Sequence, residues 1–191
     1  LKRRNSMVRK SVNLSKETHV VAANLDHAFL IATVVQPATS TGFMDRFLVS
    51  AQAYRVPVTI IFNKVDVCVE GSPERAQLEY LEGVYEKAGI PTLRTSAKTG
   101  EGLDRLSDEL ASAGVNLLSG HSGVGKSTLI NSLMPGTDLR TGEVSDAHQK
   151  GKHTTTFAEM FPLPAGGFII DTPGIKGFGL VHLERNHLHH Y

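Results

Sequence analysis

Short apolar runs recur along the chain and predict buried β-strands. The clearest run covers residues 28–35, where almost every side chain is apolar and several are β-branched. An apolar run of this length is typical of a strand that is covered on both faces of a sheet. Similar runs predict strands at residues 57–62, 92–95, 115–119, 157–163 and 167–170.

Segments with apolar residues at helical spacing separate most of these strands. Residues 42–54 carry four such side chains, at Phe43, Phe47, Leu48 and Ala51. A second helix is expected to begin after Ser72, because Pro73 suits the first helical turn, and to run to about Ala88. Two shorter helices are predicted at residues 101–110 and 126–133. This alternation predicts an α/β domain in which a mainly parallel sheet carries helices on both faces.

The composition indicates one globular domain with a small appendage. Of the 191 residues, 40% are hydrophobic and 20% are charged, and the formal net charge is +1. The chain as a whole is therefore not a strongly basic nucleic-acid binder. Positive charge gathers only at the start of the chain, at Lys2, Arg3, Arg4, Arg9 and Lys10. This arm is either an RNA contact or a solvated edge, and the sequence leaves both interpretations open.

Cys68 is the single cysteine, so we expect no disulfide within the chain and no cysteine-rich metal site. This usage suits a reducing cytoplasm. No apolar run approaches the roughly 18 residues that span a bilayer. We therefore expect a cytoplasmic monomer without membrane contact. The chain begins at Leu1 rather than at a methionine, and we expect it to be part of a longer protein.

A glycine-rich segment between a predicted strand and a predicted helix indicates a phosphate-binding loop. It comprises Gly120, His121, Ser122, Gly123, Val124, Gly125, Lys126, Ser127 and Thr128. The glycines allow successive backbone N–H groups to point at one anion, and the following helix offers its positive N-terminal end. We expect Lys126 to act in catalysis by contacting the β- and γ-phosphates, and the Ser127 hydroxyl to bind Mg²⁺.

Two further segments complete the predicted Mg²⁺ site. Asp171 follows a predicted strand, where its carboxylate can hold the metal through the water shell that Mg²⁺ retains. Three residues later, Gly174 can donate its backbone N–H to the γ-phosphate. One hydroxyl among Thr154, Thr155 and Thr156 should also bind Mg²⁺ in the GTP state, and we favour Thr155 narrowly over Thr154.

A separate set of residues predicts recognition of guanine. It consists of Asn63, Lys64 and Asp66 and, after the next predicted strand, Ser96, Ala97 and Lys98. An ionised Asp66 carboxylate only accepts hydrogen bonds, and guanine presents two adjacent donors that adenine lacks. Asp66 should therefore discriminate GTP from ATP. The stem of Lys64 can lie over the base, and Ala97 would donate its backbone N–H to the guanine oxygen.

The residue after Gly174 decides how a water molecule could be oriented for hydrolysis. Ras-like enzymes use a glutamine there, whereas this chain has Ile175, which cannot orient water. His153, beside the threonines, is the nearest candidate in sequence to position or deprotonate the water. A histidine that contacts RNA or solvent is an equally good interpretation of His153.

The order of these motifs is unusual, because the guanine set precedes the phosphate loop, whereas it follows that loop in an ordinary GTPase. The order predicts a circularly permuted P-loop GTPase. Together with the sequences at residues 120–131, 151–156, 171–175 and 178–180, it resembles the bacterial RsgA (YjeQ) family of GTPases in small ribosomal subunit biogenesis. The resemblance covers roughly residues 20–181.

The resemblance implies an N-terminal OB-fold barrel, the permuted GTPase and a C-terminal zinc-binding domain. We expect residues 1–18 to be the end of the OB-fold with its linker, 19–181 the GTPase domain and 182–191 the start of the C-terminal region. The zinc-binding domain is expected to be absent, since Cys68 is alone. The resemblance also implies partners, namely GTP and GDP, the small ribosomal subunit and its rRNA.

Several functions fit the sequence. The first is a GTPase that couples hydrolysis to late small-subunit assembly and to release of the factor. A GTP-sensing RNA-binding module with little turnover is the second, and a permuted GTPase of large-subunit assembly is the third. The loop residues Ser122 and Gly123 stand where the large-subunit relatives usually have Pro-Asn, which favours the small-subunit family. An ATPase is opposed by Asp66.

Overall fold

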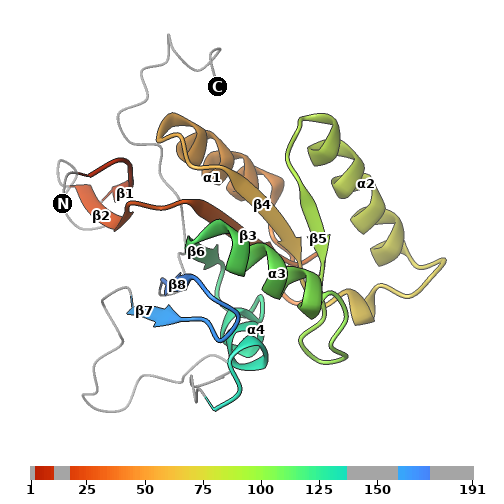
Figure 1. Ribbon diagram of the computed structural model, residues 1–191. Helices are drawn as coiled ribbons and strands as arrows, with labels where there is room; N and C mark the ends of the chain where they lie inside the picture. Colours follow the sequence, from red (N-terminus) through yellow and green to blue (C-terminus); the bar gives the residue numbers. More distant parts are fainter. Residues whose placement is uncertain (1–2, 11–17, 137–158, 173–191) are drawn as a thin grey trace, which may run out of the picture.

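A computed structural model describes residues 3–10, 18–136 and 159–172. Its centre is a six-stranded sheet in the order β5-β4-β3-β6-β8-β7 (Figure 1). The strands are β3 (His27–Ala32), β4 (Val58–Phe62), β5 (Thr92–Arg94), β6 (Val115–Gly120), β7 (Glu159–Pro162) and β8 (Phe168–Asp171). Only β7 runs antiparallel to its neighbour. The predicted mainly parallel α/β sheet is thus confirmed.

The helices cover the two faces of the sheet because alternate strand residues point to opposite sides. The helices are α1 (Thr41–Ala53), α2 (Pro73–Lys87), α3 (Leu103–Ala113) and α4 (Lys126–Leu133). On one face, Leu30 and Ile60 pack in a core cluster with the apolar sides of α1 and α2. On the other face, Phe29 and Ile61 pack with α3 and α4. Both strands β3 and β4 are thereby buried on both faces, as their continuous apolar runs require.

The start of α2 illustrates how local sequence sets an element. The Ser72 Oγ accepts a hydrogen bond from the backbone N–H of Arg75 at 3.1 Å, and Pro73 occupies the first helical position. A serine cap followed by proline satisfies one of the free N–H groups at the helix start and needs no partner for another. The predicted start after Ser72 is confirmed, and the helix ends one residue before the predicted Ala88.

A two-stranded antiparallel sheet precedes the main sheet and was only half predicted. It pairs β1 (Ser6–Lys10) with β2 (Thr18–Ala23). β1 lies within residues 1–18, which were expected to be the end of the OB-fold with its linker, but β2 was not predicted. The expected boundary after residue 18 falls at the first residue of β2, and the division into domains stays a prediction.

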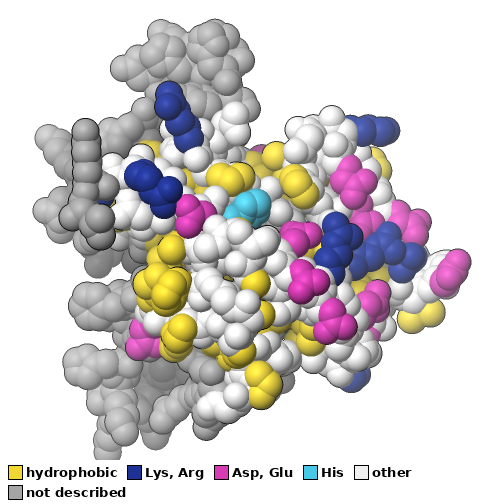
Figure 2. Space-filling view, in the orientation of Figure 1, with side chains coloured by type: hydrophobic (Ala, Val, Ile, Leu, Met, Phe, Trp, Pro, Cys, Tyr) yellow, Lys and Arg dark blue, Asp and Glu magenta, His cyan; other side chains and the backbone are white. Residues whose placement is uncertain are grey.

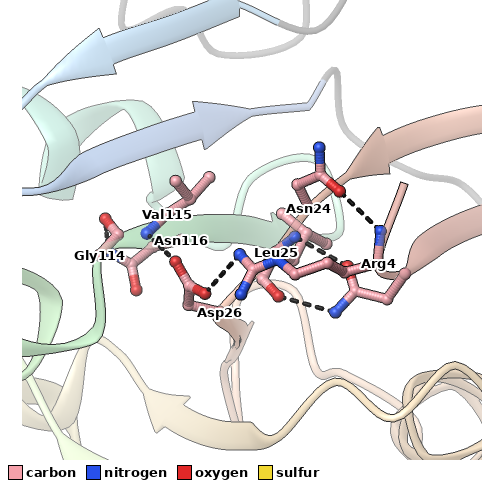
Figure 3. Close-up of polar contacts among 8 residues, drawn as sticks. Arg4, Asn24, Leu25, Asp26, Gly114, Val115 and Asn116 are labelled. Atoms are coloured by element: carbon pink, nitrogen blue, oxygen red, sulfur yellow. Dashed lines mark hydrogen bonds and ion pairs between the residues drawn. The ribbon is translucent and has the colours of Figure 1, made fainter. Parts of the chain in front are cut away.

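Hydrogen bonds and an ion pair connect this small sheet to the end of the main sheet at which β6 begins (Figure 3). The Arg4 guanidinium donates to Asp26 Oδ1 at 2.9 Å, and Asp26 Oδ2 accepts from the backbone N–H of Val115 at 3.0 Å. Asn5 and Leu25 exchange two further hydrogen bonds of 2.8 Å. Asp26 thus connects the N-terminal strands with the first residue of β6, the strand that leads into the phosphate loop.

Other predicted boundaries shift by a few residues. The strand predicted at 28–35 ends at Ala32, where the chain turns towards α1, and the helix predicted at 101–110 covers Leu103–Ala113. A short 3₁₀ helix, Val65–Val67, was not anticipated. Residues 137–158, between α4 and β7, lie outside the described residues. Within the described part of the chain, no helix is long and apolar enough to cross a membrane.

Candidate nucleotide-binding site

The predicted phosphate loop connects the carboxyl end of β6 to the start of α4. Gly120 lies where a side chain could not fit, since a Cβ atom there would be 2.7 Å from the carbonyl oxygen of Ile31. Gly125 has a φ of +90°, and a Cβ there would be 2.5 Å from the Asn63 amide nitrogen. These two glycines let the loop pass close against β3 and against the predicted guanine set. The strand–loop–helix arrangement matches the expectation from the sequence.

Lys126 and Asp171, which the sequence placed on opposite sides of a nucleotide phosphate and its metal, form an ion pair. The Lys126 ammonium donates to Asp171 Oδ1, and the two side chains are 9% and 21% exposed. Lys126 is the first residue of α4, and Asp171 is the last residue of β8. Because β6, which leads to α4, pairs in parallel with β8, the two charges lie at the same end of the sheet. The two charges therefore neutralise each other.

Ser127 and Thr128 follow in the first turn of α4. Ser127 is half-buried beside Lys126, and Thr128 is exposed. The first turn of α4 contains no acidic residue, so its N–H groups and the helix dipole present positive potential to the loop. This is the electrostatic environment that a phosphate group requires.

Asn63 joins the predicted guanine set to the phosphate loop. Its side-chain N–H donates to the Val124 carbonyl at 2.8 Å, and its side-chain oxygen accepts from the Thr95 hydroxyl at 3.1 Å. All three side chains are buried. The bond spans 61 residues of sequence, and it fixes the carboxyl ends of β4 and β6 relative to each other. The sequence analysis missed the contribution of Thr95, which directly precedes the predicted Ser96.

Lys64 reinforces the same connection from the solvent side. It has a left-handed backbone, with φ at +63°, and its ammonium donates to the carbonyls of Gln36 and Gly123 at 2.5 and 2.7 Å. The lysine stem consequently extends along the loop rather than into solvent. This position agrees with the predicted role of the stem as a surface for a flat base.

Asp66 is held by the second half of the guanine set. Its Oδ1 accepts from the Ser96 hydroxyl at 2.7 Å, while its Oδ2 lies 4.0 Å from the Lys98 ammonium. The Asp66 side chain is only 14% exposed, whereas that of Lys98 is 84% exposed. Among the described residues, none donates a hydrogen bond to Oδ2, so this oxygen can accept one from a ligand. Ala97 lies between these residues and packs against the core.

His121 uses its side chain differently from the other loop residues. Its ring packs on Phe43 of α1 with centroids 3.9 Å apart. Burial, and then the positive charge of Arg46, lower the pKa of His121 below its ordinary value. His121 and Ser122 line a cavity of about 380 Å³ together with Pro37, Ala38 and Ser40. The sequence analysis did not anticipate that the segment between β3 and α1 forms a wall of the site.

Several predicted site residues lie outside the described residues. They are His153, Thr154, Thr155, Thr156, Gly174 and Ile175. Their roles stay predictions. In the described part of the chain, no group of three or more histidine, cysteine, aspartate or glutamate side chains could hold a metal ion.

Comparison with known proteins gives a consistent result. The family described as RsgA GTPase matches residues 1–181. A small ribosomal subunit biogenesis GTPase RsgA of Bacteroides fragilis is 56% identical over 189 residues, which are 99% of this chain and 60% of that protein. The protein of the same description from Porphyromonas gingivalis is 50% identical over 192 residues, 99% of this chain and 60% of that protein.

Solved structures agree with these sequence comparisons. YjeQ from Thermotoga maritima is 34% identical with a TM-score of 0.69, over 91% of this chain and 53% of that one. YloQ, described as a circularly permuted GTPase, is 26% identical with a TM-score of 0.66, over 98% of this chain and 54% of that one. The chain thus spans about 60% of the length of the curated relatives.

Proposed function

The chain belongs to the RsgA GTPase family, and from this premise we propose that it binds guanine nucleotides and hydrolyses GTP in the biogenesis of the small ribosomal subunit. The observation that carries the proposal is the connection of Asn63 to the Val124 carbonyl. It joins a guanine-type motif directly to a phosphate loop, although the two occur in permuted order along the chain.

Recognition of guanine rests on Asp66. The Ser96 hydroxyl orients the Asp66 carboxylate through Oδ1 and leaves Oδ2 accessible. An ionised carboxylate only accepts hydrogen bonds, which matches the adjacent donors that guanine presents. Adenine would leave the half-buried carboxylate without a donor, which is costly. We therefore infer selectivity for guanine over adenine nucleotides.

The residues around Lys126 fit a Mg²⁺ ion as well as phosphates. Asp171 reaches the phosphate lysine, and the Ser127 hydroxyl lies one residue further on. Two protein oxygen donors are sufficient, because Mg²⁺ usually keeps several waters and takes its other ligands from phosphates. When bound, the ion would supply positive charge that stabilises the phosphates during transfer. We propose that Thr155 adds the third protein ligand.

For hydrolysis, the chain supplies charge and orientation. Lys126 would exchange its hydrogen bond with Asp171 for contacts with the β- and γ-phosphates. There its positive charge would stabilise the negative charge that develops as the bond between these two phosphates breaks. The N–H groups of the loop and α4 would hold the phosphates in line with the attacking water. We propose that His153 orients that water, because Ile175 cannot do so.

The relatives from Bacteroides fragilis and Porphyromonas gingivalis are described as small ribosomal subunit biogenesis GTPases, which supports the small ribosomal subunit as the partner. The γ-phosphate would order residues 154–156 and 171–179, and its loss would release them, as in other GTPase switches. We propose that this change times the release of the protein from the subunit.

GTP turnover measured against purified ribosomal subunits tests the proposal. We expect turnover to rise when the small subunit is titrated in, to rise far less with the large subunit, and to vanish in Lys126→Ala. Binding of GTP without turnover under all conditions would favour a GTP-sensing module. Stimulation by the large subunit alone would contradict the assignment of the partner.

A further inference from the structure

We propose that Gly102 is a positioning residue for the recognition of guanine, because it lets the loop between β5 and α3 present Ser96 and Ala97 to the base. The inference rests on the proposed function and adds the residue that holds this half of the guanine set in place. Gly102 is not itself part of the predicted guanine set, and it acts through the loop.

Gly102 lies directly against the last residue of β5. It has a φ of +71°, and a Cβ atom there would be 2.0 Å from the carbonyl oxygen and 3.1 Å from the carbonyl carbon of Arg94. Both are backbone atoms, so no change of rotamer can make room for a side chain. A residue other than glycine at this position must therefore displace the strand, the helix or the loop.

The strand and the helix on either side of the loop are both fixed (Figure 1). β5 pairs in parallel with β4, and the Thr95 N–H extends this pairing with a hydrogen bond of 2.9 Å to the Phe62 carbonyl. α3 buries Leu106 and Leu110 completely in the core. The loop between them is consequently the part that would yield.

The surface beside Gly102 leaves room for such a movement. A groove of about 670 Å³ borders the loop, and Glu101, Gly102 and Arg105 line one side of it. Charged side chains of both signs lie over this part of the molecule (Figure 2), among them the ion pair of Arg94 with Glu82. No close-packed apolar wall therefore stops the loop from moving outward.

Hydrogen bonds within the loop would carry the displacement to Ser96. The Glu101 carbonyl, which directly precedes Gly102, accepts from the Ser96 N–H at 2.9 Å. The carbonyl and hydroxyl oxygens of Ser96 accept from the N–H groups of Gly100 and Thr99 at 2.9 and 3.2 Å. Three bonds thus connect Ser96 with the end of the loop that meets α3.

Ser96 connects the loop in turn to the residue that recognises the base. Its hydroxyl donates to Asp66 Oδ1 at 2.7 Å, and Ala97 follows it in the chain. A displaced Ser96 would turn the Asp66 carboxylate away from the guanine donors and would carry the Ala97 N–H away from the guanine oxygen. Contacts with the phosphates should be unaffected, because the phosphate loop belongs to β6 and α4.

Gly102→Ala tests the proposal, and Gly100→Ala is its matched control. Gly100 lies in the same loop and also has a positive φ, of +85°, but no atom lies within 4 Å of the place where its Cβ would be. Both variants carry the cost of an alanine in the left-handed region, which thermal unfolding measures. Only Gly102→Ala also places a methyl group against the Arg94 carbonyl.

The affinities for GDP and ADP separate a positioning role from a general loss of structure. Titration with fluorescent GDP gives the first Kd, and displacement of this probe by ADP gives the second. We expect Gly102→Ala to raise the Kd for GDP about tenfold, which corresponds to roughly 1.4 kcal/mol, and the Kd for ADP less than about twofold. Gly100→Ala should change both by less than about twofold. A protein that is merely less well folded would lose affinity for both nucleotides alike.

A second variant keeps the test decisive if Gly102→Ala does not fold. The Arg94 guanidinium donates two hydrogen bonds, of 2.6 and 2.5 Å, to the buried Glu82. Glu82→Gln loosens this hold on the residue that Gly102 contacts, and it should raise the Kd for GDP about threefold, whereas Glu79→Gln, which affects only the exposed pair with Arg75, should not.

The proposal is overturned if the ratio of the two affinities in Gly102→Ala equals that of the wild type, or, where that variant does not fold, if the ratio in Glu82→Gln does. A wild type that binds ADP as tightly as GDP is a different failure. It would overturn the proposed recognition of guanine, and this inference with it.

Discussion

The substitution Asp66→Asn gives the sharpest test of the nucleotide assignment. In the wild type, Asp66 Oδ1 accepts from Ser96, and no hydrogen bond from a described residue reaches Oδ2, which lies 4.0 Å from the Lys98 ammonium. An asparagine that keeps the Ser96 bond through its oxygen must present its NH₂ group where Oδ2 was. A donor would then face a guanine donor, and the charge opposite Lys98 would be lost.

The magnitude follows from these contacts. A hydrogen bond to a charged acceptor contributes about 1.5–3 kcal/mol, and an opposed, unsatisfied donor costs about 1–3 kcal/mol. Because the Asp66 side chain is only 14% exposed, water can replace the lost bond only in part. We therefore expect a loss of about 3–4 kcal/mol, or a Kd for GDP that rises by a factor of roughly 10²–10³. Xanthine nucleotides, which offer a carbonyl in place of the amino group, should gain affinity.

Fluorescent-nucleotide titration with GDP, XDP and ADP measures the effect, with thermal unfolding as the check on folding. Asp104→Asn is the matched control, because it removes an exposed carboxylate from the first turn of α3 that is not part of the predicted guanine set. A Kd for GDP within threefold of the wild type would refute the reasoning. So would a wild-type protein that binds ADP as tightly as GDP.

Three further predictions concern catalysis and stability. Lys126→Ala should lower turnover by at least about 10²–10³ through the loss of charge at the phosphates, and unchanged single-turnover rates would contradict this role. His153→Ala should lower turnover on the small subunit by a factor of roughly 10²–10⁴ at little cost in nucleotide affinity; loss of subunit binding instead would identify His153 as an RNA contact. The pKa of Asp26 is lowered, first by the hydrogen bond from the Val115 N–H and also by Arg4. The ionised Asp26 carboxylate therefore stabilises the folded state above the ordinary pKa of 3.8, and this stabilisation is lost as pH falls through the lowered pKa of the folded state. Asp26→Asn should therefore lower the free energy of unfolding at pH 7 and weaken its acid dependence below about pH 4. Urea titrations measure both effects, and a variant whose free energy of unfolding falls with acid as steeply as that of the wild type would contradict the stabilising role of Asp26.

The sequence predicted most of the main sheet because its signals are local. Residues 57–62 form a continuous apolar run, and the run becomes β4, buried on both faces. β2 escaped prediction because its stability comes from pairing with β1 and one of its valines, Val20, stays 47% exposed. An apolar run shows what must be buried, but a half-exposed strand carries a weaker signal.

The same difference between local and long-range features applies to the candidate site. The glycine and lysine positions of the phosphate loop were predictable, since each has a local steric or electrostatic reason. The bond from Asn63 to Val124 and the ion pair of Lys126 with Asp171 were not, because they join residues 61 and 45 positions apart. The wall formed by Pro37, Ala38 and Ser40 carried no recognisable motif and became visible only through its contact with the loop.

Parallel pairing explains why a permuted order can leave the site unchanged. The carboxyl ends of β4, β6 and β8 lie at the same end of the sheet. Asn63, Gly120 and Asp171 therefore meet there whichever strand comes first in the chain. What the order does change is where other parts attach. β1 and β2 join at the opposite end of the sheet, through Asp26 and the start of β6, whereas Asp171 and Thr172 lie at the site. A partner bound to the N-terminal strands would therefore act on the site only through the length of β6.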